Sequence, residues 1–245
     1  MHLKSIRIGA LAALLAGADC FADASAADSP FLMPEHSSEF AVGAAWVYGE
    51  EDEGSAQRSS FLRPHFEARW SNGVFLNGLW LGKELSSVPH LRYGPLLSLG
   101  RERTSPNGGS GSLKPLVGAF WEYRVLHNLS VKTFGYRMAG NRGGGLLDLQ
   151  VASLNGMAPH HLLGLAAGLR LADRRYLQAH FGAGEDASGG VRDAYLRGAW
   201  QWELSRKYTA SAALEYKRLE GSAAASPWTA RRGSLASFVM LSYRY

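Results

Sequence analysis

Apolar and polar residues alternate along most of this chain from about residue 40 onward, which is the period of a β-strand. In residues 62–70, one face would carry Leu62, Pro64, Phe66, Ala68 and Trp70, and the other would carry Arg63, His65, Glu67 and Arg69. Residues 117–125 and 208–217 divide in the same way. No helical period fits the first of these segments. The pattern predicts strands with one apolar and one polar face.

Twelve segments carry this pattern and are predicted as strands. They are Phe40–Tyr48, Ser60–Trp70, Val74–Gly82, Leu91–Arg101, Leu113–Val125, Leu129–Met138, Leu146–Leu154, His161–Leu171, Tyr176–Ala183, Ala194–Leu204, Tyr208–Leu219 and Leu235–Tyr245. An even number places both chain ends on one side of a membrane. One alternative stays open: if Ala172–Arg175 continues one long strand instead of breaking it, the missing strand would lie near Glu84–His90.

Strands that cross a bilayer must close on themselves, because backbone groups in hydrocarbon can pair only with other backbone. We therefore predict an all-β fold, a closed antiparallel transmembrane β-barrel of about 12 strands over residues 40–245. After residue 26, no apolar run approaches the ~18 residues that a membrane-spanning helix needs. The expected location is the outer membrane of a Gram-negative bacterium.

The first 26 residues have the features of a cleaved signal peptide. Lys4 and Arg7 precede the apolar run Ile8–Ala18, and Ala24–Ala26 supplies small residues for cleavage. Residues 27–39 would then form a periplasmic segment before the barrel. Cys20 raises the alternative of a lipoprotein, although Asp19 stands where a small residue would be expected. A mature chain without cysteine has no thiolate for catalysis or metal binding.

The last strand carries a second targeting feature. Val239, Leu241, Tyr243 and Tyr245 fall on its outward face, and the chain ends on an aromatic residue. Such an ending is typical of the signal that the barrel-assembly machinery recognises in bacterial outer-membrane proteins. The machinery is therefore an expected partner, together with outer-membrane lipid and lipopolysaccharide.

The formal charge of +5 changes this interpretation little, since it is spread over many strands and loops. No basic tract indicates nucleic-acid binding. Charged residues of both signs are instead predicted to face the lumen, which favours pairs across it over the one-sign ring of a selective pore. They are Arg63, Glu67, Arg69, Arg92, Glu122, Arg124, Arg170, Arg197, Glu203, Glu215, Lys217 and Arg244.

Candidate chemistry is sparse. The acidic residues Glu50–Glu53 could hold a divalent cation, which prefers oxygen ligands, but they lack the spacing of a calcium loop and are interpreted as a solvated outer loop. Several histidines are present, yet no Gly-x-Ser-x-Gly or His-Glu-x-x-His motif accompanies them. The sequence predicts no catalytic residue, no cofactor and no metal site.

Three stretches together resemble the MltA-interacting protein (MipA/OmpV) family of outer-membrane proteins. They are Leu91–Arg101 with its Gly94-Pro95 step, the acidic first loop followed by an aromatic strand and Val74–Gly78, and Arg231–Ser234 leading into the terminal strand. The chain ends in Tyr245 where many members end in Phe. The resemblance implies a scaffold that holds a lytic transglycosylase together with a bifunctional penicillin-binding protein, and it supplies no catalytic residue.

Two hypotheses of function follow. The first is this non-enzymatic scaffold, with contacts from the periplasmic turns and residues 27–39. The second is a narrow solute channel or a surface-exposed adhesin or receptor that uses the lumen and the outer loops. A plugged lumen would favour the scaffold, and an open lumen would favour the channel.

Overall fold

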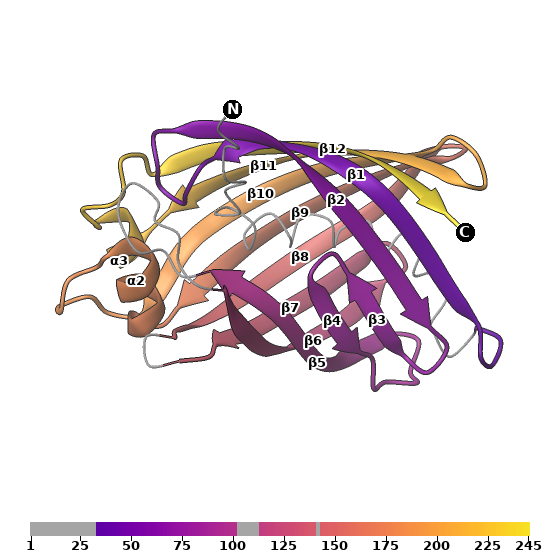
Figure 1. Cartoon of the computed structure of the whole chain (residues 1–245), viewed down its shortest axis with the longest axis horizontal. Coiled ribbons are helices and arrows are strands. Elements are labelled where there is room, and N and C mark those ends of the chain that lie inside the picture. Colours follow the sequence, from indigo (N-terminus) through magenta and orange to yellow (C-terminus); the bar gives the residue numbers. More distant parts are fainter. Residues whose placement is uncertain (1–32, 102–112, 141–142) are drawn as a thin grey trace, which may run out of the picture.

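Each strand of the barrel pairs with the next one in the chain, and the last strand closes on the first (Figure 1). The computed structural model describes residues 33–101, 113–140 and 143–245, so the predicted signal peptide lies outside the described residues. The strands are β1 (Ser38–Glu50), β2 (Arg58–Trp70), β3 (Val74–Asn77), β4 (Trp80–Lys83), β5 (Leu91–Arg101), β6 (Leu113–Leu126), β7 (Leu129–Met138), β8 (Gly145–Ala158), β9 (His161–Ala172), β10 (Gly190–Glu203), β11 (Tyr208–Leu219) and β12 (Gly233–Arg244). The predicted closed antiparallel barrel of twelve strands is confirmed.

The alternation of residue types becomes the inner and outer faces of the wall. In β11, Leu214 and Tyr216 are 55% and 50% exposed on the outside, whereas Glu215 is buried inside. The closing strand β12 follows the same rule, with Val239 and Leu241 exposed and Phe238 buried. The outer surface is thus an apolar band that suits lipid, and the charged residues gather within.

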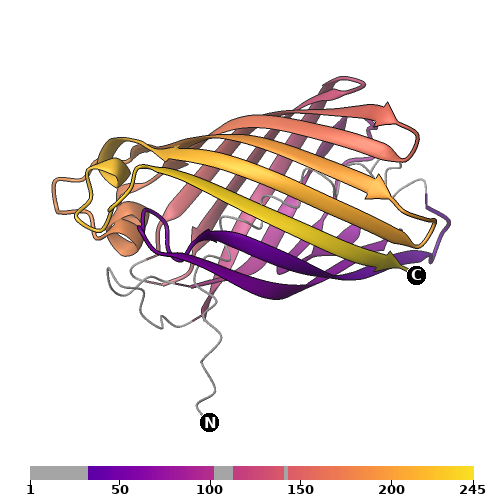
Figure 2. The ribbon, with the colours of Figure 1, turned by 90° about the horizontal axis from the view of Figure 1, so that it is seen from above.

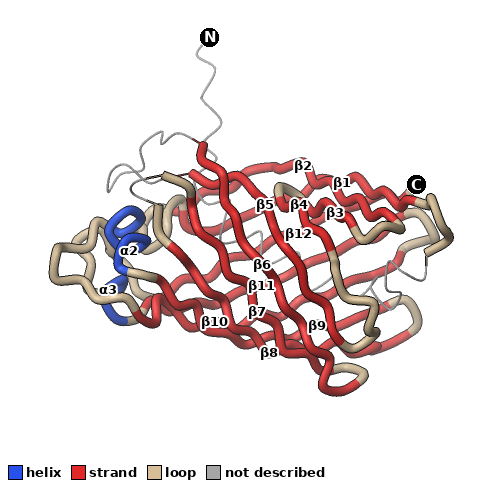
Figure 3. Tube along the Cα trace, turned by 90° about the horizontal axis from the view of Figure 1, so that it is seen from below, coloured by secondary structure: helices blue, strands red, loops and turns tan. Residues whose placement is uncertain are grey.

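The connections identify the two ends of the barrel. At the end that holds the start of β1 and the end of β12, four connections have two to four residues: 71–73, 127–128, 159–160 and 204–207. At the opposite end, 51–57, 173–189 and 220–232 are longer and include both helices, as Figures 2 and 3 show. Short turns face the periplasm in outer-membrane barrels. The helical end is therefore extracellular.

The predicted strand Tyr176–Ala183 is wrong, because this segment forms α2 (Arg174–Phe181). The Asp173 carboxylate accepts a hydrogen bond from the Tyr176 N–H at 2.7 Å and caps the first turn. Gly182, with a φ of 59°, ends the helix in the left-handed conformation. A second helix, α3 (Gly221–Ala224), is a single turn. Within the described residues, neither helix is long and apolar enough to cross a membrane.

The predicted strand Val74–Gly82 is also wrong, since it folds into the hairpin of β3 and β4. The chain reverses at Gly78, which has a φ of 59°. The two errors cancel in the strand count. The strand β9 ends at Ala172, as predicted. The twelfth strand is supplied by the division of residues 74–83 into β3 and β4, and Glu84–His90 forms a connection.

Candidate functional site

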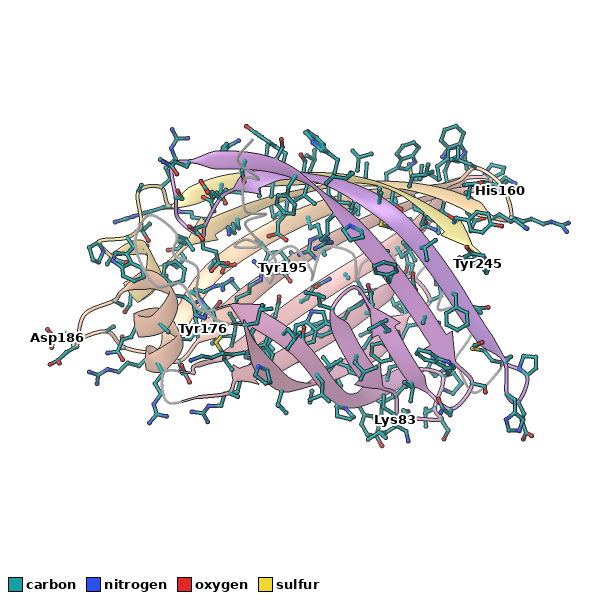
Figure 4. All side chains as sticks on the ribbon, in the orientation of Figure 1. Lys83, His160, Tyr176, Asp186, Tyr195 and Tyr245 are labelled. Atoms are coloured by element: carbon teal, nitrogen blue, oxygen red, sulfur yellow. The ribbon has the colours of Figure 1, made fainter. Side chains whose placement is uncertain are left out.

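A structure that we call the lid lies at the extracellular mouth of the barrel and is made of α2, α3 and the β1–β2 connection 51–57. On α2, Leu177 and Phe181 are 2% and 0% exposed. They pack in one apolar cluster with Leu146 of β8 and Leu219 of β11, both on the inner face of the wall, and with Ala223 of α3. Figure 4 shows α2, marked by Tyr176, at the end of the barrel.

Hydrogen bonds tie the lid to its neighbours. The Asp173 carboxylate also accepts from the Gly145 N–H at 2.9 Å, which joins α2 to the start of β8. The Ser226 hydroxyl donates to the carbonyl of Phe181. The carbonyl of Gly54 accepts from the N–H groups of Ala230 and Arg231 at 2.8 and 3.1 Å. Three separate connections are therefore held as one layer.

Beneath the lid lies a buried group of ion pairs, the main cluster, with Arg170 at its centre. The Arg170 guanidinium lies 3.1 Å from Asp148, 3.1 Å from Asp193 and 3.3 Å from Glu215. Glu215 also pairs with Arg197 through the Nε at 2.9 Å. The five side chains come from β8, β9, β10 and β11. Four adjacent strands are thereby linked across the inner wall.

Arg192 connects the main cluster to the lid. Its Nε donates to Asp193 at 2.5 Å, and its Nη1 donates to Glu53 of the lid at 3.1 Å and to the Tyr176 hydroxyl of α2 at 2.8 Å. Lys217 lies 3.3 Å from Glu50 and 3.7 Å from Glu53. The main cluster thus opposes four cations with five carboxylates, so its charges are nearly balanced.

Tyr195 adds a neutral partner on the inner wall, where Figure 4 labels it within the barrel. Its hydroxyl donates to Asp148 at 2.8 Å and contacts Gln150 at 3.1 Å, while the Arg170 guanidinium lies 4.1 Å from its ring centre. A balanced and hydrogen-bonded arrangement of this kind is what burial of charge requires.

Burial and the neighbouring charges shift the pKa values of two ionisable groups of the lid, Glu53 and Tyr176. Burial alone would raise the pKa of Glu53, but the positive charges of Arg192 and Lys217 outweigh it and lower the pKa to about 2. Burial raises the pKa of the Tyr176 phenol well above its ordinary value. At neutral pH, Glu53 is therefore a carboxylate and Tyr176 a neutral hydroxyl.

A smaller cluster lies nearer the periplasmic end. Arg92 of β5 lies 3.1 Å from Glu84 and 3.2 Å from Glu122 of β6, and Lys132 of β7 lies 3.6 Å from Glu122. Glu84 is only 2% exposed, although it lies in the connection between β4 and β5. This cluster links the end of the short hairpin to the full-length strands beside it.

The structure places the predicted luminal charges in different settings. Arg170, Arg197, Glu215 and Lys217 meet in the main cluster, and Arg92 and Glu122 in the smaller one. Glu203 lies at the periplasmic rim, about half exposed, and contacts His160 at 3.5 Å. Five residues form none of the ion pairs described above for the two clusters: Arg63, Glu67, Arg69, Arg124 and Arg244.

The predicted carboxyl-terminal signal residues lie on the outer face. Tyr243 stacks edge-on against Tyr208 and Tyr245, with ring centres 5.1 and 4.9 Å apart. Val239 and Leu241 are exposed. The residues form an apolar and aromatic strip at the periplasmic end of β12, and their role in assembly stays a prediction.

Sequence reasoning missed several members of the main cluster. Asp148 could have been found, because Leu147, Leu149 and Val151 alternate with it on the outer face. Asp193 and Arg192 precede the predicted strand, beside a bulge between Val191 and Asp193. The interpretation of Glu50 and Glu53 as parts of a solvated loop is wrong, since both pair with buried cations. Within the described residues, no group of three or more His, Cys, Asp or Glu is arranged to hold a metal ion.

Comparisons with known proteins agree with the architecture. A family model described as MltA-interacting protein MipA matches residues 42–245. A search of the curated proteins finds no match. Among solved structures, a bacterial polysaccharide outer membrane secretin is similar at a TM-score of 0.53 and 9% identity, over 87% of this chain and 100% of that one.

Two further structures are similar over most of their length. The NanC porin has a TM-score of 0.48 and 8% identity, over 82% of this chain and 98% of its own. An outer membrane channel from Pseudomonas putida F1 has a TM-score of 0.45 and 12% identity, over 87% and 97%. At such low identity, a structural likeness speaks for the fold alone.

Proposed function

Because this chain belongs to the MltA-interacting protein MipA family, and is thus an outer-membrane β-barrel of a Gram-negative bacterium, we propose that it is a non-enzymatic scaffold that holds a lytic transglycosylase at its periplasmic rim. The family match begins inside β1 and ends at the last residue, so it includes almost all of the barrel. The partner is taken from the family name, in which MltA is a lytic transglycosylase.

The lid at the extracellular mouth carries this proposal. A pore for solutes needs a continuous water-filled path through the lumen. In this barrel, the apolar side chains of α2 lie over the main cluster, whose ion pairs are buried and nearly neutral. Opening this end would separate Arg192 from Glu53 and expose Phe181. The lid therefore favours a contact surface for partners at the periplasmic end of the barrel.

At the periplasmic rim, the described connection between β4 and β5 offers the most suitable contact surface. Leu85 and Val88 are 52% and 53% exposed there. Residues 33–37, part of the proposed periplasmic segment 27–39, precede β1 at the same end. The other described turns at this end are short, and a stable interface needs about 800 Å² from each partner. The partner would therefore contact the 84–90 connection and the segment before β1 together.

The test is a binding assay between the refolded barrel and a purified MltA-type lytic transglycosylase. We expect saturable binding to the wild type and at least a roughly tenfold weaker affinity for the double variant Leu85→Asp, Val88→Asp, because two buried apolar contacts would be lost. Asp186→Lys, in the exposed connection at the opposite end, is the matched control and should bind like the wild type.

Absence of binding to the wild type would refute the scaffold, and equal binding by the double variant would move the contact to another part of the rim. A bifunctional penicillin-binding protein is proposed as a second partner. If the barrel brings the two enzymes together, the penicillin-binding protein should be retained on the immobilised barrel only when the transglycosylase is present.

A further inference from the structure

The barrel wall is incomplete above the short hairpin. β3 pairs with β2 only at Glu67, Ala68 and Arg69, and β4 pairs with β5 only at Leu96 and Leu97. On these facing edges, residues 58–65 of β2 and 98–101 of β5 have no strand partner within the part of the chain that the structure describes. Figure 1 shows β2 and β5 standing apart beyond the tip of the hairpin. We call this region the lateral opening.

The lateral opening lies at membrane depth. The hairpin tip is level with Phe66, whose carbonyl accepts from the Gly78 N–H at 2.8 Å, four residues from the end of β2 at Trp70. With a rise of about 3.3 Å per residue and a strand tilt of about 40°, the tip is roughly 10 Å from the periplasmic end. The apolar band of such barrels is about 25 Å tall. The opening therefore faces the outer half of the bilayer.

The outer margin of the opening is apolar. Leu62 and Phe66 of β2 are 72% and 51% exposed, and Leu97 and Leu99 of β5 are 49% and 48% exposed. These side chains suit an acyl chain. Unpaired backbone groups at this depth are costly in pure hydrocarbon, so a ligand that brings polar atoms into the opening would stabilise it.

The inner margin provides an unpaired cation. Arg63 faces the lumen on β2, and among the described residues no carboxylate lies within 4.0 Å of its guanidinium. The arginines of the two clusters each pair with carboxylates. His65, the next inward residue of β2, is 4% exposed. The lumen next to the opening is thus suited to a negative charge.

Ser98 marks the opposite margin. It faces inward on β5 and is 8% exposed, and its buried hydroxyl has no hydrogen-bond partner among the described residues. Buried hydroxyl groups are normally paired, and an orphan requires an explanation. Both margins of the opening therefore carry inward polar side chains with unused hydrogen-bonding capacity, which at Ser98 is buried.

We propose that the lateral opening binds a long-chain carboxylate from the outer leaflet, with the acyl chain against Leu62 and Phe66 and the carboxylate on Arg63. A single unpaired guanidinium matches a single negative charge, and the planar guanidinium can donate two hydrogen bonds to a carboxylate. Arg63 lies five residues from the outer end of β2, roughly 13 Å along the strand after tilt. The head of a two-chain phospholipid, which stays at the interface, would be too far out.

The test uses the refolded full barrel in discs of zwitterionic lipid, with the fluorescent fatty acid cis-parinaric acid as the probe. We expect saturable binding that Arg63→Gln weakens by roughly tenfold or more, as loss of a charge-assisted pair should. Arg63→Lys should bind between the two. Arg124→Gln, which removes an inward cation on β6 away from the opening, is the matched control and should bind like the wild type.

Three results would overturn the proposal: no saturable binding, equal binding by Arg63→Gln, or equally tight binding of the methyl ester of the probe. Competition by phosphatidylglycerol as strong as by palmitate would assign the site to a phospholipid head group instead. Because Arg63 forms no ion pair with the described residues, Arg63→Gln should fold, which heat-modifiable mobility on a gel verifies. The assay contains no partner enzyme, so its outcome is separate from that of the scaffold.

Discussion

At the scale of single residues, buried arginines hold the inner wall together by opposing carboxylates from different strands. Arg170 pairs with three carboxylates and is 2% exposed. A buried pair of this kind contributes little compared with an apolar alternative, but removal of one partner leaves an uncompensated charge. The strength of the main cluster therefore depends on its completeness.

Arg170→Met should lower the free energy of unfolding by about 3–5 kcal/mol, because Asp148, Asp193 and Glu215 would lose their shared cation. Urea unfolding of the barrel in lipid vesicles, followed by tryptophan fluorescence, measures this. The control is Arg218→Met, whose pair with Glu220 is mostly exposed and should contribute no more than about 1 kcal/mol. Equal losses in the two variants would contradict the importance of burial.

Acid should weaken the lid through Glu53. Its pKa is lowered from 4.5 to about 2 in the folded protein, so its carboxylate stabilises the fold fully above pH 4.5. That stability is lost as the pH falls from 4.5 to about 2. We expect the urea midpoint of the wild type to fall over this window relative to Glu53→Gln, which lacks the titrating group. Parallel curves for the two proteins would exclude this contribution.

At the scale of elements, α2 depends on its two ends. The Asp173 carboxylate accepts hydrogen bonds from both Tyr176 and Gly145, and thus stabilises the first turn and its attachment to β8. At the other end, a Cβ added to Gly182 would lie 2.2 Å from the Trp228 ring. The helix is too short to be stable alone, so capping and packing against the wall maintain it.

Asp173→Ala should therefore loosen α2 by about 1–2 kcal/mol, the usual effect of losing a helix cap. Arg174 and Arg175 are exposed directly after it and provide the readout, since trypsin should cleave there several-fold faster in the variant. Asp186→Ala, in the same connection but outside the helix, should leave the rate unchanged. Similar rates in Asp173→Ala and the wild type would mean that packing alone holds α2.

At the scale of the whole molecule, the lid lies over the extracellular end of the barrel, and strand pairing between β2 and β5 is missing at another point of the wall. An apolar cluster and ion pairs with β1, β10 and β11 hold the lid, so it cannot open by moving one side chain. The wild type should therefore give no steady conductance in a planar bilayer.

Replacement of Arg174–Phe181 by a flexible glycine-serine linker should produce measurable conductance, because the apolar layer over the main cluster would be removed. The same replacement of residues 184–187, which lie outside the helix, should stay silent. Steady conductance of the wild type would support the channel hypothesis over the scaffold.

More of the fold than of the candidate site could be predicted from the sequence. Alternation identified ten strands, because the face on which a side chain lies depends only on its position within its own strand. It failed at residues 176–183, where Leu177, Ala179 and Phe181 fit period two while Leu177 and Phe181 also fit one face of a helix. Asp173 and Gly182 were the caps that could have decided between the two. Asn77-Gly78 was likewise a turn signal inside a predicted strand.

The sequence by itself determined that the chain forms a barrel and that residues of its regular strands alternate between the two faces of the wall, since both follow from local periodicity. Only the tertiary structure decided how the charges pair and where the wall is incomplete. Arg192 and Glu53 are 139 positions apart, and Arg170 and Glu215 are 45 apart. Contacts at such separations depend on strand register, barrel closure and the folding of the lid, which involve all the strands at once and no single segment.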